Sequence, residues 1–161
     1  MINKLHLAMI ELYSGDAKRI QHFCKVHSYA KLIAEAEKVD EKTLFIIEAA
    51  ALTHDIGIHF CEEKYGNCAG KLQEKEGPAI AANLLKELGF DDDVSERVQF
   101  LIAHHHTYDN IDSADYQILV EADFLVNIME DGLSKDAALS AYNRIFRTEC
   151  GKKICRNMFG I

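Results

Sequence analysis

Apolar residues recur along most of the chain at the three- and four-residue spacing of amphipathic helices, and no segment alternates apolar and polar residues as a strand does. Aspartates suited to cap helices, such as Asp16 and Asp40, and glycines suited to end them divide this pattern into segments. The predicted helices cover residues 2–13, 16–39, 40–57, 78–89, 91–106, 115–130 and 134–148, followed by a short helical tail to residue 157. The sequence therefore predicts an all-α fold of about seven helices without a sheet, forming one domain over residues 1–161.

Residues 58–75, IHFCEEKYGNCAGKLQEK, are the exception to the helical pattern. A connection of this length is unusual inside a helical domain, and such loops often cover binding sites. The segment directly follows the pair His54-Asp55 and contains Gly70-Lys71. Because glycine permits close approach of the backbone, we expect a loop that covers a pocket beside the pair.

Four of the predicted helices place a histidine or an aspartate among their core-facing apolar residues. His22, for example, shares one helical face with Val26 and Ile33. The residues so placed are His22, His54, His104 and Asp123. Buried ionisable groups need partners, and imidazole and carboxylate together are common ligands of first-row metals. The spacing alone leaves a metal site and a set of hydrogen-bonded core residues as equal alternatives.

Composition narrows the choice of function class. With 48% hydrophobic and 27% charged residues the chain is expected to fold, and its net charge of −8 disfavours general binding to nucleic acid. No apolar run is expected to span a membrane, and the N-terminus does not have the pattern of a signal peptide. Five cysteines, an odd number, are typical of reduced thiols. We therefore expect a cytoplasmic protein without a membrane partner.

Three stretches in order, RIQHFCKVHSYA, AALTHDIG and ILVEADFLVNI, resemble the HD-domain superfamily of metal-dependent phosphohydrolases. The resemblance covers about residues 18–130. It implies one divalent first-row transition metal ion, which could be Fe, Mn, Zn, Ni or Co. The ligands that it implies for this ion are His22, His54, Asp55 and Asp123.

Some members of that superfamily hold a second metal ion with two further histidines. Gly77, before Pro78, stands where one of them is expected, and His104 aligns with the other. Half of the second set is therefore missing. Glu76 is the nearest substitute, although a glutamate at a helix start is usually solvated. We expect one ion.

The resemblance implies hydrolysis of a phosphoester by a metal-activated water, on a small phosphorylated molecule with nucleotides among the candidates. Asp55 is expected to act as ligand and proton acceptor, His105 to face the substrate, and Lys71 to contact the phosphate. Two alternatives stay open: a di-iron oxygenase of HD type, and a catalytically silent ligand-sensing module. A C-terminal apolar stripe that includes Phe146 fits either the core or the contact of a homodimer.

Overall fold

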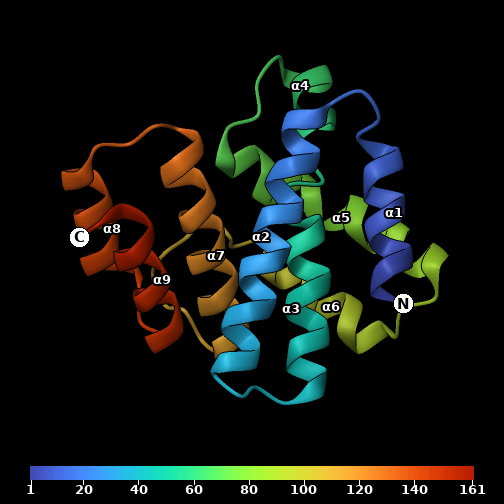
Figure 1. Cartoon of the computed structure of the whole chain (residues 1–161). Helices are drawn as coiled ribbons and strands as arrows, with labels where there is room; N and C mark the ends of the chain where they lie inside the picture. Colours follow the sequence, from blue (N-terminus) through green and yellow to red (C-terminus); the bar gives the residue numbers. More distant parts are fainter.

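Nine α-helices and no strand make up the computed structural model, which describes residues 1–161 (Figure 1). The all-α prediction is confirmed. The helices are α1 Ile2–Leu12, α2 Ala17–Ala36, α3 Glu41–Thr53, α4 Ile58–Tyr65, α5 Gly70–Leu88, α6 Asp92–Ile102, α7 Ala114–Glu130, α8 Lys135–Ile145 and α9 Glu149–Phe159.

Helices α2 and α3 form an antiparallel pair at the centre of the molecule, and α7 packs against both (Figure 1). The two predicted caps start this pair. The side chain of Asp16 accepts a hydrogen bond from Arg19 N at 3.2 Å, and that of Asp40 accepts one from Thr43 N at 3.0 Å. Most of α7 is buried, which makes it the central helix of the core. Each helix of this trio contributes to the site described below.

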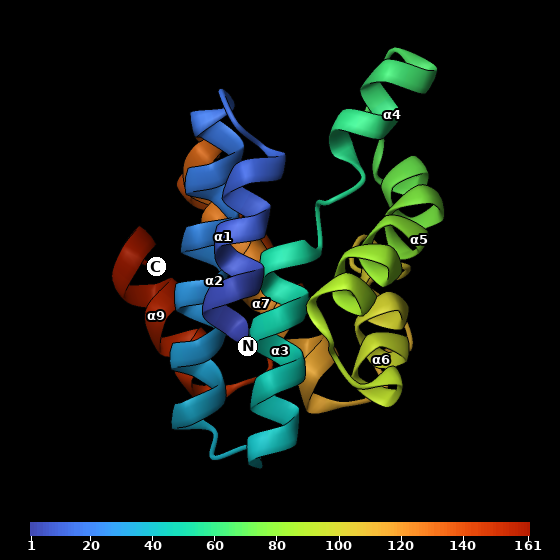
Figure 2. The ribbon, with the colours of Figure 1, turned by 90° about the vertical axis from the view of Figure 1, so that its right-hand side faces the viewer.

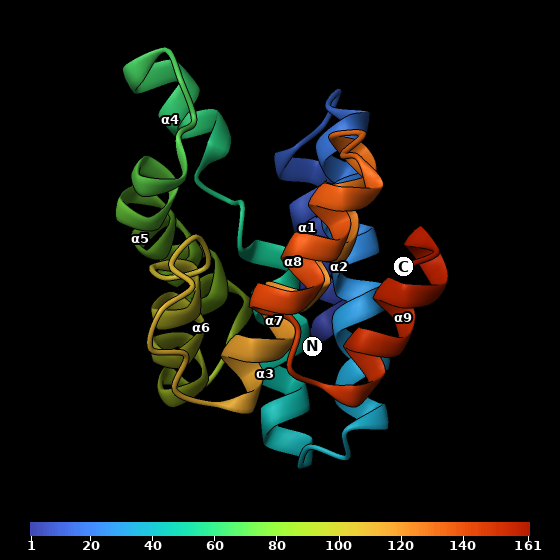
Figure 3. The same ribbon diagram turned by 90° about the vertical axis from the view of Figure 1, so that its left-hand side faces the viewer.

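The remaining helices cover the two sides of the trio. Helices α5 and α6 lie beyond α3, and α4 extends above them at the end of a short connection from α3 (Figure 2). On the opposite side α8 and α9 pack against the outer face of α7 (Figure 3). Phe146 is buried there, and Ile154 and Phe159 pack against the core. The C-terminal stripe therefore covers the core of its own chain.

The prediction of a loop over residues 58–75 is wrong, because this segment is mostly helical. It contains α4, a left-handed turn at Gly66 and the start of α5 at Gly70, eight residues before Pro78. The buried face of the first turns of α5 carries the polar residues Gln73 and Glu74. Apolar periodicity could not reveal these turns, because the residues that face inward there are hydrogen-bonding ones.

Gly57 and Gly77 explain how α5 packs so closely against the turn that follows α3. A Cβ on Gly57 would lie 3.1 Å from the Cα of Gly77, and a Cβ on Gly77 would lie 2.8 Å from Cγ2 of Ile102. Neither position has room for a side chain without a shift of its neighbours. The position where a second-metal histidine was expected is therefore occupied by a contact between backbones.

Residues Glu41–Tyr65 are long and apolar enough to cross a membrane by length and composition alone, contrary to the expectation from the sequence. In this structure 72% of the most apolar window is buried. The turn at residues 54–57 divides the run into α3 and α4. A buried core helix has the same length and composition, so these two properties do not distinguish a core helix from a membrane-spanning one.

Candidate metal centre

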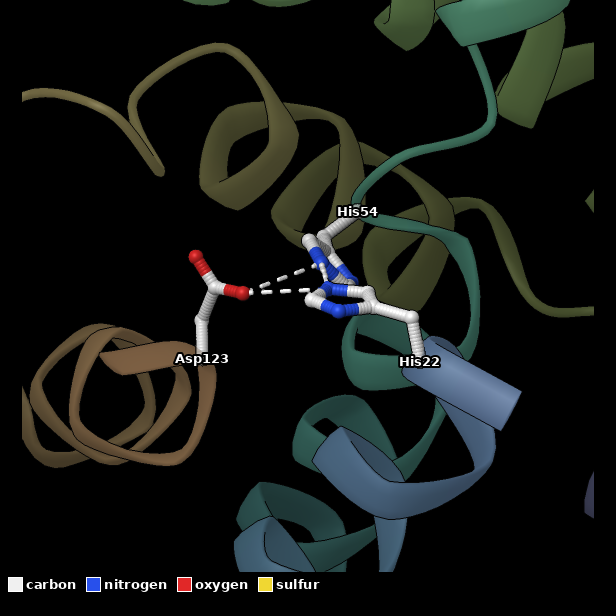
Figure 4. Close-up of side chains that lie close together, drawn as sticks. All are labelled: His22, His54 and Asp123. Carbon is white, nitrogen blue, oxygen red and sulfur yellow. Dashed lines mark hydrogen bonds and ion pairs between the residues drawn. The ribbon is translucent and has the colours of Figure 1, made fainter. Parts of the chain in front are cut away.

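Four side chains from three parts of the chain converge at the junction of α2, α3 and α7. His22 comes from the second turn of α2, His54 and Asp55 follow the last residue of α3, and Asp123 comes from the middle of α7. His22 Nε2 lies 3.2 Å from both His54 Nε2 and Asp123 Oδ1 (Figure 4). Asp55 Oδ2 lies 3.5 Å from each of the two Nε2 atoms. The structure thus brings together all four residues that the resemblance implies.

The spacing of these donor atoms fits a first-row metal ion. Five distances among the four atoms lie between 3.2 and 3.5 Å. Separations of this length are those between two ligands of a tetrahedral ion with bonds of about 2.1 Å, which matches metal bonds to imidazole nitrogen and carboxylate oxygen. In addition, Asp123 Oδ1 is buried and has no hydrogen-bond partner. A bound cation would satisfy this oxygen, so donor chemistry and geometry both fit a metal.

The far nitrogen of each imidazole is occupied by a partner that orients the ring. His22 Nδ1 lies 3.0 Å from Glu130 Oε2, whose other oxygen accepts a hydrogen bond from Lys25 Nζ at 2.7 Å. His54 Nδ1 donates to the carbonyl oxygen of Ala51 at 2.9 Å. In the neutral ring, which is the form that binds a metal, proton donation from Nδ1 leaves the lone pair of Nε2 directed at the centre. Glu130 is a supporting residue that the sequence analysis did not identify.

The pKa values show that the centre has an excess of negative charge. Burial alone would lower the pKa of His54, but the carboxylates of Asp55 and Asp123 outweigh it and raise this pKa to about 9. The same competition raises the pKa of His22. Burial opposes ionisation of both aspartates, yet the histidines lower the pKa of Asp55 to about 2 and that of Asp123 well below its usual range. Protons or a metal ion must balance these carboxylates.

A second group of donors adjoins the first through Asp55. Its Oδ1 lies 3.5 Å from Nε2 of His105, which is fully buried and has no hydrogen-bond partner on that nitrogen. His105 Nδ1 donates to the carbonyl oxygen of Ile102 at 2.7 Å. His106 completes the group, and one ligand atom from each of the three residues lies within 4.8 Å of the others. Asp55 therefore faces both donor groups, one with each carboxylate oxygen.

A cleft of about 440 Å³ opens beside the centre, and His22 and Asp55 are part of its wall. Lys18 and Arg19 supply positive charge to this wall, and Gln73 and Asn127 supply amides. Small substrates bind in clefts of this size. Segment 58–75 contributes part of the lining, as expected of it, through Ile58 of α4, Cys68 of the short connection and Gln73 of α5.

Two predicted ligands of a second metal, His104 and Glu76, do not reach the centre. His104 stacks on Phe100 with ring centroids 4.2 Å apart, and Nδ1 of His104 donates to the carbonyl oxygen of Phe100. Glu76 accepts hydrogen bonds from Tyr65 and Lys64. Neither belongs to a group of donors that could share an ion.

Lys71 is also elsewhere than expected. Its ammonium lies 2.6 Å from Glu74 Oε2 and 2.8 Å from Thr107 Oγ1, and its side chain is 75% exposed. It is not part of the cleft wall. The cations of the wall are instead Lys18 and Arg19, at the start of α2, which the sequence analysis did not identify.

Comparison with known proteins agrees with this geometry. The model of the HD domain family matches residues 19–145, which include all four donors. The chain belongs to the HD domain family. Among solved structures, it is similar to a predicted HD superfamily hydrolase from an uncultured Thermotogales bacterium, with 27% identity and a TM-score of 0.70. That match covers 98% of this chain and 84% of the other. No curated protein matches the chain. HD domains bind divalent metals and belong to a superfamily of metal-dependent hydrolases. This HD protein has a His/Asp cluster that could hold such an ion.

Proposed function

We propose that this HD protein is a metal-dependent phosphohydrolase that cleaves the phosphoester of a small phosphorylated molecule. One observation carries the proposal: the donors of His22, His54, Asp55 and Asp123 converge at the wall of a cleft that also contains cationic side chains, with each carboxylate 3.2–3.5 Å from both Nε2 atoms. A cation beside a phosphate-sized space is the arrangement that phosphoryl chemistry requires.

The chemistry divides between the ion and the chain. A divalent ion, when bound, lowers the pKa of water and polarises a phosphoryl oxygen. The two oxygens of Asp55 point in different directions: Oδ2 faces the ion site, and Oδ1 faces His105. Because Nδ1 of His105 already donates to Ile102, Nε2 is the acceptor nitrogen of this ring in its neutral form. Water between Asp55 and His105 would thus be oriented by two acceptors, and either could take its proton.

Lys18 and Arg19 supply the charge that holds the phosphate. Lys18 is exposed in the cleft wall and makes no ion pair. The guanidinium of Arg19 is held by Asp16 at 2.7 Å and by Glu62 at 2.6 Å. A guanidinium fixed in place is well suited to contact phosphate oxygens at little further cost in side-chain entropy.

A di-iron oxygenase is the second candidate, and the group of Asp55, His105 and His106 is the observation that favours it. This group adjoins the first and could hold another ion. Two observations disfavour a second ion. Gln73 Oε1 already lies 3.3 Å from Nε2 of His106, and Gly77 stands where a histidine ligand of the second metal is expected. We propose one tightly bound ion. Two tightly bound irons per chain, with oxygen consumption, would support the oxygenase instead.

The test is metal analysis of protein purified without chelator, paired with hydrolysis of p-nitrophenyl phosphate in the presence of Mn²⁺, Fe²⁺, Co²⁺, Ni²⁺ or Zn²⁺. We expect about one ion per chain, loss of hydrolysis after chelation, and recovery when the ion is restored. Asp55→Asn should abolish hydrolysis with an unchanged helical circular-dichroism signal. Asp92→Asn, on an exposed aspartate of α6, is the matched control. Hydrolysis that persists in Asp55→Asn, or that is insensitive to chelation, overturns the proposal.

A further inference from the structure

The wall of the cleft beside the metal centre is polar almost throughout. Only two of its eleven residues are hydrophobic, Ile58 and Cys68, and none is aromatic in the sense of Phe, Tyr or Trp. Ligand pockets are ordinarily lined by apolar and aromatic side chains. A nucleobase gains much of its affinity by stacking on an aromatic ring. The composition of this wall therefore disfavours a base and favours a hydrophilic ligand.

Helix α7 presents a row of hydrogen-bonding groups that leads away from the centre. Asp123, Asn127 and Asp131 are spaced by four residues and lie on one side of the helix, about 6 Å apart along its axis. Asn127 and Asp131 line the cleft, and neither side chain makes a hydrogen bond or an ion pair within the chain. An amide both donates and accepts, and a carboxylate accepts, so together they match the hydroxyl groups of a ligand.

The charges around the cleft limit the ligand to little negative charge. The wall contains one lysine, Lys18, and one arginine, Arg19, and the charge of Arg19 is shared with two carboxylates. Asp16, Glu130 and Asp131 also line it, and the chain has a net charge of −8. A single phosphate can be neutralised by the ion together with Lys18 and Arg19. A chain of phosphates would bring further charge against the carboxylates.

We propose that the substrate is a phosphorylated sugar or polyol with a single phosphate group, whose hydroxyls are bound by Asn127 and Asp131. This inference rests on the proposed function, because it places the phosphate at the metal centre beside Asp123. Asn127, one helical turn further along α7, then lies at the distance of a hydroxyl group a few bonds from the phosphate.

A nucleotide would need a different place for its base. The apolar hollow between α7 and α8, of about 300 Å³, is the candidate, because Tyr108 and Phe124 line it with their ring centroids 5.0 Å apart. This hollow and the cleft beside the metal centre have no lining residue in common. This alternative makes a separate prediction, that Tyr108→Ala weakens the binding of a nucleotide and leaves a sugar phosphate unaffected.

The experiment is calorimetric titration of the Mn²⁺-loaded protein with the phosphonate analogues of ribose 5-phosphate and of adenosine 5′-monophosphate. Phosphonates are not hydrolysed, so binding is measured whether or not the protein turns over a substrate, and hydrolysis of p-nitrophenyl phosphate tests the proposed function separately. The two ligands differ chiefly in the base. We expect the base to add no affinity. Tighter binding of the nucleotide analogue by about 10-fold or more, as aromatic stacking would give, overturns the inference.

Asn127→Ala provides the second arm. It should weaken the ribose phosphonate by about 10-fold, as loss of paired hydrogen bonds does, and should leave methylphosphonate, which has no hydroxyl, unchanged. Asn143→Ala, on an exposed asparagine of α8, is the matched control and should change neither. An equal loss for both ligands in Asn127→Ala, or no loss for either, contradicts the role of Asn127 in binding hydroxyls.

Discussion

Metal binding to this HD protein should release protons, because the two histidines of the centre hold protons that an ion must displace. The carboxylates of Asp55 and Asp123 raise the pKa of His54 to about 9 and also raise that of His22. At pH 7, two units below a pKa of 9, about 99% of His54 is protonated. Coordination needs the neutral imidazole. We therefore expect roughly one to two protons to be released per ion bound at pH 7.

The sign of the pH dependence follows. A group whose pKa is raised in the metal-free protein keeps its proton as the pH falls, so acid competes with the metal. Between pH 8 and pH 6 the association constant should fall by about 100-fold for each proton released. A histidine with its ordinary pKa of about 6.5 would give a much smaller fall over this range.

Calorimetric titration with Mn²⁺ at pH 7, in two buffers of different ionisation enthalpy that do not bind the metal, counts the protons directly. His104→Gln is the control, since that ring packs on Phe100 away from the centre, and its proton count should equal that of the unmodified protein. One ion bound with no proton released refutes the reasoning, because it means that the histidines are neutral in the metal-free protein or do not ligate.

Three further predictions follow from the surroundings of the centre. Glu130→Gln should weaken metal binding by about 10- to 100-fold, since Glu130 orients the ring of His22, and a titration that shows unchanged affinity would contradict that role. Gly77→Ala should lower the free energy of unfolding by about 1–3 kcal/mol in urea, because its Cβ would lie 2.8 Å from Ile102, whereas the exposed Asn83→Ala should change it by less than about 0.5 kcal/mol. Arg19→Ala should raise KM for p-nitrophenyl phosphate by about 10-fold, as expected for loss of a charge-assisted contact, and Lys71→Ala should leave it unchanged. If KM instead rose in Lys71→Ala and stayed unchanged in Arg19→Ala, the phosphate would lie beside α5.

The helical core could be predicted from the sequence because its helices follow the apolar period closely. His22, His54 and Asp123 each occupy a position of that period, so their spacing in the sequence predicts that they face the core, where the structure buries them. The resemblance then added Asp55. Spacing could not have done so. His54, the C-cap of α3, still has helical backbone angles, whereas Asp55 lies one residue further into the turn, off the face that His54 shares with the core.

The errors have two physical causes: polar residues that face inward, and a helix that ends earlier than predicted. Gln73 and Glu74 are buried because they contact the segment at His106, and their polarity hid the first turns of α5. His104 was aligned with a ligand position, but α6 ends at Ile102, and in the following turn it is His105 that faces Asp55. Registers that extend a helix past its end are unreliable for this reason.

The supporting residues were missed because charged residues near helix ends are usually solvated. A signal for Glu130 did exist. It follows Asp123 by seven residues, which is two turns of one helix and therefore the same face. Lys18 and Arg19 gave no such signal, because their place in the cleft depends on how α4 and α5 pack against the start of α2.

The central claim is that His22, His54, Asp55 and Asp123 hold one catalytic metal ion, and anomalous scattering from crystals grown with Mn²⁺ or Co²⁺ tests it most directly. We predict a strong peak about 2.0–2.3 Å from His22 Nε2, His54 Nε2, Asp123 Oδ1 and an oxygen of Asp55. Growing the same crystals from Asp55→Asn protein should weaken or remove the peak. A strong peak elsewhere, with these four side chains free of metal, contradicts the account.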